Sequence, residues 1–409
     1  MTSLMSLVGI ASLLALAFLC STNRKKINLR TVGGAFALQV LIGAFVLYVP
    51  AGREVLNGIS VGVANVISYA NDGIRFLFGG LAGDEIDGIG FVFAIKVLPV
   101  IVFFSALVAV LYHLRVMDFV IKILGGGLQK LLGTSKPESL SATANIFVGQ
   151  TEAPLVVKPF IATMTRSELF AVMVGGLATV AGSILAGYVS LGVELKYLIA
   201  ASFMAAPGGF LMAKMMVPET ETPKQDLNDL DHGEEKPVNV IDAAAGGALN
   251  GMQLAMNVGA MLLAFVALIA LSNGFVGWIG GWFDNPDLTI QQILGYAFAP
   301  IAWLLGIPWS EAQLAGSFIG QKLVVNEFVA YLDFMNYQAQ LSEHTKAVVT
   351  FALCGFANLS SIAILLGGIG GMAPSRRKDI AQLGLRAVLA GSMANLMSAA
   401  IAGFFLSIA

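Results

Sequence analysis

The chain has 409 residues, of which 57% are hydrophobic and only 12% are charged, and its formal net charge is −2. Soluble proteins carry about 25% charged residues, so this composition excludes a soluble enzyme, a disulfide scaffold and a disordered chain. The small net charge also offers no basic surface for nucleic acid. A mean hydropathy of +0.82 predicts an all-α integral membrane protein surrounded by lipid.

Eight apolar segments are long enough to cross a bilayer, which takes about 20 helical residues. Basic residues follow the first segment, at 4–20, and do not precede it. That order is the reverse of a signal peptide, so we expect a retained helix. The other seven follow in chain order at 31–50, 91–114, 168–192, 196–217, 243–272, 346–372 and 384–408.

Three further segments predict helices that lie along the membrane surface. Residues 52–80 are amphipathic and are expected outside, whereas 117–132 have one apolar face and are expected on the cytoplasmic surface. Counting 289–307 as a span would send the Arg376–Lys378 cluster outside, and all four tryptophans lie in this part of the chain. We therefore place 289–307 along the outer interface, which keeps the basic clusters cytoplasmic and both termini outside.

Two stretches, 135–164 and 310–340, are too polar for lipid-facing spans and too apolar for loops. The first opens with Ser135 and Glu138 in capping-box spacing, and Pro154 then prevents the helix from continuing. Each stretch contains a Gly-Gln pair and precedes two strong spans. This pattern predicts two re-entrant hairpins, which enter from opposite faces as inverted repeats.

Two of the spans are interrupted by small and polar residues, at 179–184 and 355–361. Unwound backbone at membrane depth persists only where it is buried in protein or lines an aqueous cavity. Its free carbonyl groups can coordinate a small cation. We therefore expect each broken span to lie beside one hairpin and to share a site with it.

Glu152 and Glu327 are carboxylates inside the two hairpins. Burying a charge in the bilayer costs about 2.5 kcal/mol or more, so such residues favour a ligand or coupling role. The structural alternative is neutralisation by Lys158 and Lys322, which lie close in sequence.

Polar side chains at the same breaks either bind a ligand or hydrogen-bond neighbouring helices. The amide and hydroxyl candidates are Gln150, Thr151, Asn358 and Ser361. Asn145 and Thr179 offer oxygen atoms, which suit a hard cation. The metal-protease motif HExxH is absent from the sequence, and two hairpins with central carboxylates fit alternating access better than a passive channel.

Three motifs resemble the concentrative nucleoside transporter family in its shorter bacterial form. They are GQTEAP at 149–154, NEF at 326–328 and GFANLSSIAILLGGIG at 355–370. The resemblance runs over essentially the whole chain. It implies sodium-driven nucleoside import across a bacterial inner membrane, with proton coupling as the alternative.

The resemblance also implies which residues form the binding sites. The nucleobase contacts are Gln150, Thr151 and Glu152; the ribose contacts are Glu327, Asn358 and Ser361; the apolar walls are Ile184, Leu254 and Phe356. The sodium ligands are the Asn145 and Thr179 side chains and the carbonyls of Val148, Thr179 and Val180.

A homotrimer and a movement of the elevator type are further implications of the family. The scaffold would comprise 1–116 and 243–288, and the mobile transport domain would comprise 117–217 and 289–409. A cytoplasmic loop at 218–242 would connect them.

Overall fold

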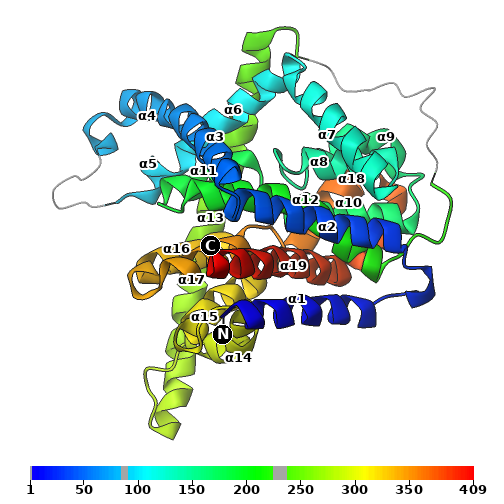
Figure 1. The fold of residues 1–409 in the computed structure, drawn as a ribbon. Coiled ribbons are helices and arrows are strands. Elements are labelled where there is room, and N and C mark those ends of the chain that lie inside the picture. Colours follow the sequence, from blue (N-terminus) through cyan, green and yellow to red (C-terminus); the bar gives the residue numbers. More distant parts are fainter. Residues whose placement is uncertain (1, 84–90, 224–236) are drawn as a thin grey trace.

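The computed structural model describes residues 2–83, 91–223 and 237–409, and every regular element within them is a helix (Figure 1). Most of the expected connecting loop, at 224–236, lies outside the described residues. The helices before the first hairpin are α1 (Thr2–Leu19), α2 (Leu29–Leu47), α3 (Pro50–Ser68), α4 (Ala70–Phe78), α5 (Phe93–Lys96), α6 (Leu98–His113) and α7 (Val116–Leu132). The all-α prediction is confirmed.

The first half of the predicted repeat contains short and broken helices. They are α8 (Lys136–Ala144), the 3-10 turn η3 (Ala153–Val157), α9 (Lys158–Ile161), α10 (Arg166–Ala178), α11 (Gly182–Ser190) and α12 (Leu195–Met216). After the long α13 (Val240–Gly280), the second half comprises α14 (Ile290–Leu304), α15 (Trp309–Val324), α16 (Glu327–Tyr337), α17 (Glu343–Leu353), α18 (Ser361–Met372) and α19 (Arg377–Ile408).

Local capping fixes where several of these helices begin. Thr165 and Glu168 form a capping box at the start of α10, and Thr289 and Gln292 form another at α14. The side chain of Asn326 accepts from the Val329 N–H and so caps α16, which begins at Glu327. The sequence itself therefore fixes where these helices begin.

Among the described residues, seven helices are long and apolar enough to cross a membrane. An eighth results if α14 and α15, which meet at a bend of 115°, count as one span. The expected span at 346–372 is not one continuous helix, because it is divided into α17 and α18 by residues 354–360. Helix α14 occupies most of 289–307, and its place along the outer interface remains a prediction.

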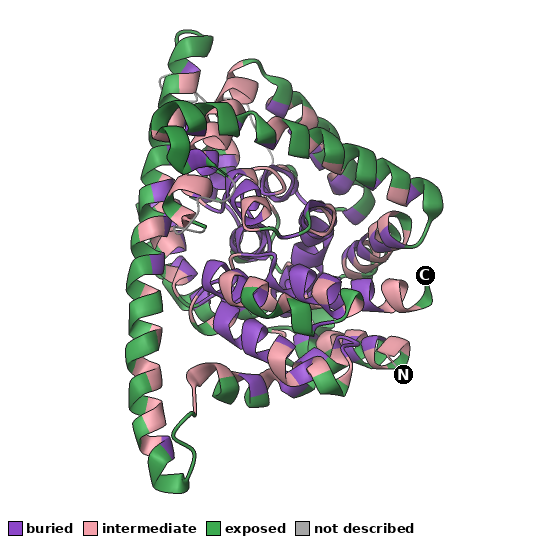
Figure 2. Ribbon diagram, turned by 90° about the vertical axis from the view of Figure 1, so that its left-hand side faces the viewer, coloured by how far each residue is buried: buried purple, intermediate pink, exposed green. Residues whose placement is uncertain are grey.

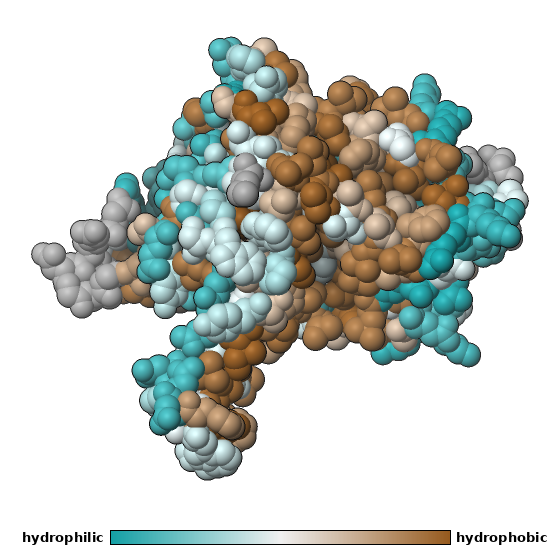
Figure 3. All heavy atoms as spheres, turned by 60° about the horizontal axis from the view of Figure 1, so that its bottom comes forward, coloured by the Kyte–Doolittle hydropathy of each residue, from teal (hydrophilic) through white to brown (hydrophobic). Residues whose placement is uncertain are grey.

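Two classes of span differ in what surrounds them. In the most apolar 18-residue stretch of α10–α11, and in that of α12, 94% of the stretch is buried inside the protein. In the corresponding stretches of α1, of α5–α6 and of the helix that contains α13, only 17% is buried. In Figure 2, α13 runs along one side of the molecule with much of its length exposed. Figure 3 shows a broad hydrophobic face with hydrophilic residues at its edges. These outer helices contact lipid or other apolar partners.

The pairing of helices places the two broken spans at the centre. Helices α1, α2, α12 and α19 lie side by side in Figure 1, and α13 packs mainly against α6. Helix α10 packs against α12 and α19, and α17 packs against α19 as well. The two chain ends lie near each other in Figures 1 and 2.

Candidate binding site

The first hairpin is a helix, a turn and a short second arm. Helix α8 begins where the Ser135 N–H donates to Glu138 Oε1 over 2.7 Å, as its sequence predicts, and it ends at Asn145. In the turn, the Gly149 N–H donates to Glu152 Oε2 over 3.3 Å. This hydrogen bond is within the turn itself and holds the Glu152 carboxylate at the tip of the hairpin.

The second hairpin turns at Val325 and Asn326, between α15 and α16. Its Gly-Gln pair, Gly320–Gln321, lies inside α15, whereas the pair of the first hairpin lies in the turn. Glu327 is the first residue of α16, where the positive end of the helix dipole favours its carboxylate. It is 5% exposed.

Asn358 organises the break between α17 and α18. Its Nδ2 donates to Glu327 Oε2 over 3.0 Å, and its Oδ1 accepts from the Ser361 N–H at 3.0 Å and from the Ser360 hydroxyl at 2.7 Å. The Ser361 hydroxyl lies 2.6 Å from the Phe356 carbonyl oxygen, to which it donates. These contacts tie the second hairpin to the second break and fix the side chains before any ligand binds.

Three backbone contacts connect segments that are far apart in the chain. The Gly182 N–H donates to the Phe147 carbonyl over 2.9 Å, which joins the first break to the first hairpin. The Leu359 N–H donates to the Leu323 carbonyl over 3.3 Å, which joins the second break to the second hairpin. The two breaks meet where the Phe356 N–H donates to the Thr179 carbonyl over 3.2 Å.

A cavity of about 130 Å³ lies where these four segments converge. All nine residues expected to contact substrate line it: Gln150, Thr151, Glu152, Ile184, Leu254, Glu327, Phe356, Asn358 and Ser361. The lining combines carboxylate and amide groups with apolar walls, which is the composition of a site for a small polar ligand. The Gln150 Oε1 atom is buried and lacks a hydrogen-bond partner among the described residues.

Several lining residues were not anticipated from the sequence. Val258, Met261 and Leu262 extend the wall that Leu254 begins, all from α13. Their spacing from Leu254 is four, seven and eight residues, which is one face of a helix. That periodicity was available in the sequence, but it does not distinguish a face toward a cavity from a face toward lipid.

The expected ion ligands gather between the first hairpin and the first break. Asn145 Nδ2 donates to the Ser141 carbonyl, while its Oδ1 is buried without a hydrogen-bond partner in the described chain. The Thr179 hydroxyl donates to the Gly175 carbonyl over 2.9 Å, so its oxygen lone pairs remain available. Val148 and Val180 are buried beside them, and their carbonyls accept none of the hydrogen bonds found in the described turns.

These oxygen atoms suit a hard monovalent cation. A buried amide oxygen without a donor is costly, and a bound ion would satisfy it. Broken helices with unwound carbonyls provide such ion sites in transporters. The donor set therefore fits sodium.

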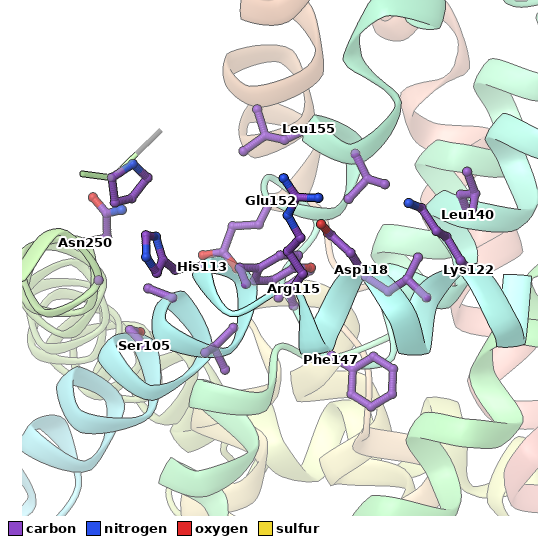
Figure 4. A pocket seen from close by; sticks show the side chains of 18 of the residues that line it. Ser105, His113, Arg115, Asp118, Lys122, Leu140, Phe147, Glu152, Leu155 and Asn250 are labelled. Atoms are coloured by element: carbon purple, nitrogen blue, oxygen red, sulfur yellow. The ribbon is translucent and has the colours of Figure 1, made fainter. Parts of the chain in front are cut away.

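A larger cavity of about 980 Å³ reaches Glu152 from the other side (Figure 4). Its lining includes His113, Arg115, Asp118 and Lys122, which lie on or between α6 and α7. Glu152 lines both cavities and thus stands at the boundary between them. Figure 4 shows charged and polar side chains, among them Arg115, Asp118 and Lys122, together with the apolar Leu140, Phe147 and Leu155 in the lining of this cavity.

The structural alternative for Glu327 was neutralisation by Lys322. The Lys322 ammonium instead donates to the Ala352 carbonyl over 2.9 Å and to Asn395 Oδ1 over 2.6 Å. Among the described residues it forms no ion pair within 4.0 Å. Lys322 therefore does not hold Glu327 in a direct ion pair, and the Glu327 carboxylate accepts from Asn358 Nδ2 instead.

Family models match most of the chain. Residues 197–403 match "Na+ dependent nucleoside transporter C-terminus", residues 8–81 match the corresponding N-terminus, and residues 94–194 match a gate model described as "Nucleoside recognition".

Named relatives and solved structures agree with those matches. The chain is 52% identical to the nucleoside permease NupC of Helicobacter pylori, over 100% of this chain and 99% of that protein. It is 38% identical to the human sodium/nucleoside cotransporter 1, over 98% of this chain and 63% of that protein. CNTnw in an inward-facing, substrate-bound state is 61% identical over 100% of this chain and 99% of its own, with a TM-score of 0.96. A substituted CNTnw in an outward-facing state is 62% identical over 100% of both chains, with a TM-score of 0.98.

Proposed function

Since the chain belongs to the concentrative nucleoside transporter family, we propose that it imports nucleosides by sodium symport across a bacterial inner membrane. Its relatives are permeases and cotransporters, so it is a membrane transporter and not an enzyme. The observation that carries the substrate assignment is the convergence of nine predicted residues on one small cavity.

The chemistry of that cavity divides between the two parts of a nucleoside. Gln150, Thr151 and Glu152 at the tip of the first hairpin offer the donors and acceptors that a base edge needs. Glu327 accepts the protons of ribose hydroxyls, and Asn358 and Ser361 assist it. Ile184, Leu254 and Phe356 form the apolar walls that contact the base and the sugar.

Sodium is proposed as the co-transported ion because the donor set near Asn145 consists of neutral oxygen atoms. Ion binding would draw the first hairpin to the first break and so position Gln150 and Glu152 for the base. The human relative is named a sodium/nucleoside cotransporter, which supports the same ion. Proton coupling is the alternative outcome of the experiment below.

We propose that transport follows alternating access by an elevator movement. The scaffold would comprise 1–116 and 243–288, and the mobile domain 117–217 and 289–409, joined by the cytoplasmic loop at 218–242. The larger cavity, beside Arg115 and Lys122, would be the exit on the cytoplasmic side. The exposed apolar length of α13 leaves a surface for contact with further copies, and we propose a homotrimer, as in the family that the chain resembles. The placement of the basic clusters supports both termini in the periplasm.

Uptake into proteoliposomes tests this function. Purified protein is reconstituted, and radiolabelled uridine and adenosine uptake is measured under an inward sodium gradient, an inward proton gradient or neither. We expect concentrative uptake with sodium alone. Absence of uptake under every gradient would refute the transport proposal, and uptake with protons alone would refute the sodium site.

A further inference from the structure

Lys322 is a charged residue at membrane depth that the proposed substrate and sodium sites do not use. It lies in α15, the first arm of the second hairpin, and it is 3% exposed. Its ammonium group contacts two neutral oxygen atoms, the Ala352 carbonyl and Asn395 Oδ1. A buried lysine normally needs a carboxylate partner, so coordination by neutral oxygens resembles the surroundings of a metal cation.

Asn395 extends this contact to both broken spans. From α19, its Nδ2 donates to the Ala178 carbonyl over 2.6 Å and to the Cys354 carbonyl over 2.9 Å. Ala178 is the last residue of α10, and Cys354 follows the last residue of α17. A Cβ atom at Gly355 would collide with the Asn395 side chain, so the asparagine packs directly against the backbone of the second break.

The carbonyls that end a helix carry partial negative charge, equivalent to about half an elementary charge. Lys322 therefore places a full positive charge at the negative end of α17. In the first half, the corresponding place is next to the end of α10, between that break and the end of the first hairpin arm at Asn145. Among the described residues, the groups expected to bind a cation there are the oxygen atoms of Asn145 and Thr179.

From this correspondence we propose that Lys322 is a built-in cation of the second half, taking the place that sodium takes in the first half. The ammonium group fastens the second hairpin to the second break without an exchangeable ion. It thereby positions Glu327, which lies five residues further along the same hairpin. The proposal rests on the sodium site of the proposed function.

Three variants separate charge from packing and hydrogen bonding. Lys322→Ala removes the charge and leaves space, Lys322→Met removes the charge and fills the space, and Lys322→Gln keeps hydrogen-bonding capacity without charge. Lys214→Ala is the matched control, because Lys214 is also buried but pairs with Glu138 at 2.6 Å, away from the cavity lining. Folding of each variant is checked by size-exclusion chromatography and thermal unfolding.

The measurement is equilibrium binding of labelled uridine in detergent as a function of sodium concentration. We expect the Lys322 variants to lose about tenfold or more in affinity, since one charge-assisted contact corresponds to roughly that factor. In Lys322→Ala alone, ammonium or methylammonium chloride should restore the affinity for uridine. In the same variant, uridine binding should depend more steeply on sodium concentration, because a second sodium ion binds in the space left by the lysine. Lys214→Ala should keep near-wild-type uridine affinity without added amines, because the Lys214–Glu138 pair does not line the cavity.

Two results would overturn the proposal. One is wild-type uridine affinity and sodium dependence in Lys322→Gln or Lys322→Met. The other is a folded Lys322→Ala whose affinity no added cation restores. If Lys322→Ala does not fold, uridine binding to Lys322→Gln decides between the two roles. A role in hydrogen bonding alone would leave uridine affinity intact in Lys322→Gln, whereas a role of the charge predicts its loss. Failure of the sodium symport itself is recognised separately, from uptake by the wild-type protein.

Discussion

Single side chains in the cavity are held by partners that the protein supplies before a ligand arrives. Asn358 uses both its donor and its acceptor atoms within the site, so its orientation follows from the hydrogen bonds around it. Gln150 and Asn145 are the opposite case, because each has a buried oxygen without a donor in the described chain. The hydrogen bonds of Asn358 give the site its shape, and the free oxygens of Gln150 and Asn145 fit the ligand and ion contacts proposed for them.

Replacing Glu327 by Gln should weaken nucleoside binding about tenfold or more. The amide fills the same space, but the charged acceptor for ribose hydroxyls is lost, and charge-assisted hydrogen bonds contribute about 1.5–3 kcal/mol. Uridine binding to the purified protein in saturating sodium measures the change. Glu343→Gln is the control, since that carboxylate is exposed and pairs with Lys346. Unchanged affinity in Glu327→Gln would remove Glu327 from the site.

Replacing Asn145 by Ala should raise the sodium concentration for half-maximal uptake by about tenfold, because one oxygen ligand is lost. Uridine affinity at saturating sodium should change much less, since Asn145 does not line the small cavity. Sodium titrations of uptake measure both. Asn257→Ala, an exposed site on α13, should leave the titration unchanged. A wild-type titration in Asn145→Ala would contradict the assignment.

At the scale of elements, close contact between α6 and α13 is made possible by glycine. Gly247 and Gly251 are spaced as in small-xxx-small motifs, which bring membrane helices together. A Cβ atom at Gly251 would lie 2.7 Å from the Ser105 Cβ and 2.8 Å from the Val102 Cα. The backbones therefore leave no room for a larger residue at this crossing.

Gly251→Leu should lower the thermal stability of the protein, because overpacking costs about 1–3 kcal/mol. Gly246→Leu is the matched control, since no atom lies within 4 Å of a Cβ built there. Thermal unfolding of both variants in detergent gives the comparison. Equal midpoints of thermal unfolding for the two variants would contradict this, because they would show that α6 and α13 can move apart without loss of stability.

For the whole molecule, the proposed elevator movement requires some helix pairs to slide and others to stay together. Helix α6 packs against α13, which would share the scaffold, and against α11, which would move. At the second contact, a Cβ atom at Gly187 would lie 3.4 Å from Val97 Cγ1. Cysteine pairs at the start of α6 can therefore test both contacts, the one with α13 and the one with α11.

A disulfide between Val97→Cys and Gly187→Cys should block uptake, and reduction should restore it, because the bond joins scaffold to mobile domain. The neighbouring pair Leu98→Cys and Gly259→Cys joins α6 to α13 and should leave uptake largely intact after oxidation. Uridine uptake before and after reduction is the measurement. Full transport with the first pair oxidised would contradict the proposed division of the chain.

Much of this organisation could be read from the sequence because its causes are local or compositional. Scarce charge requires a lipid environment, and Pro154 and the polar run after Cys354 prevent continuous helices where they occur. Carboxylates such as Glu152 and Glu327 are too costly for lipid and so indicate a protein-lined site. The fold class followed from these signals, and so did the nine residues of the cavity once the three motifs were recognised.

Only the tertiary structure decided which groups meet. The contact of Phe356 with Thr179, and the face of α13 that includes Val258, depend on packing between segments far apart in the chain. The sequence left open whether Lys322 pairs with Glu327, and in the structure the ammonium contacts oxygens of α17 and α19. A turn or a cap is determined by neighbouring residues, whereas the partner of a buried charge is whichever group the folded helices bring within hydrogen-bonding distance.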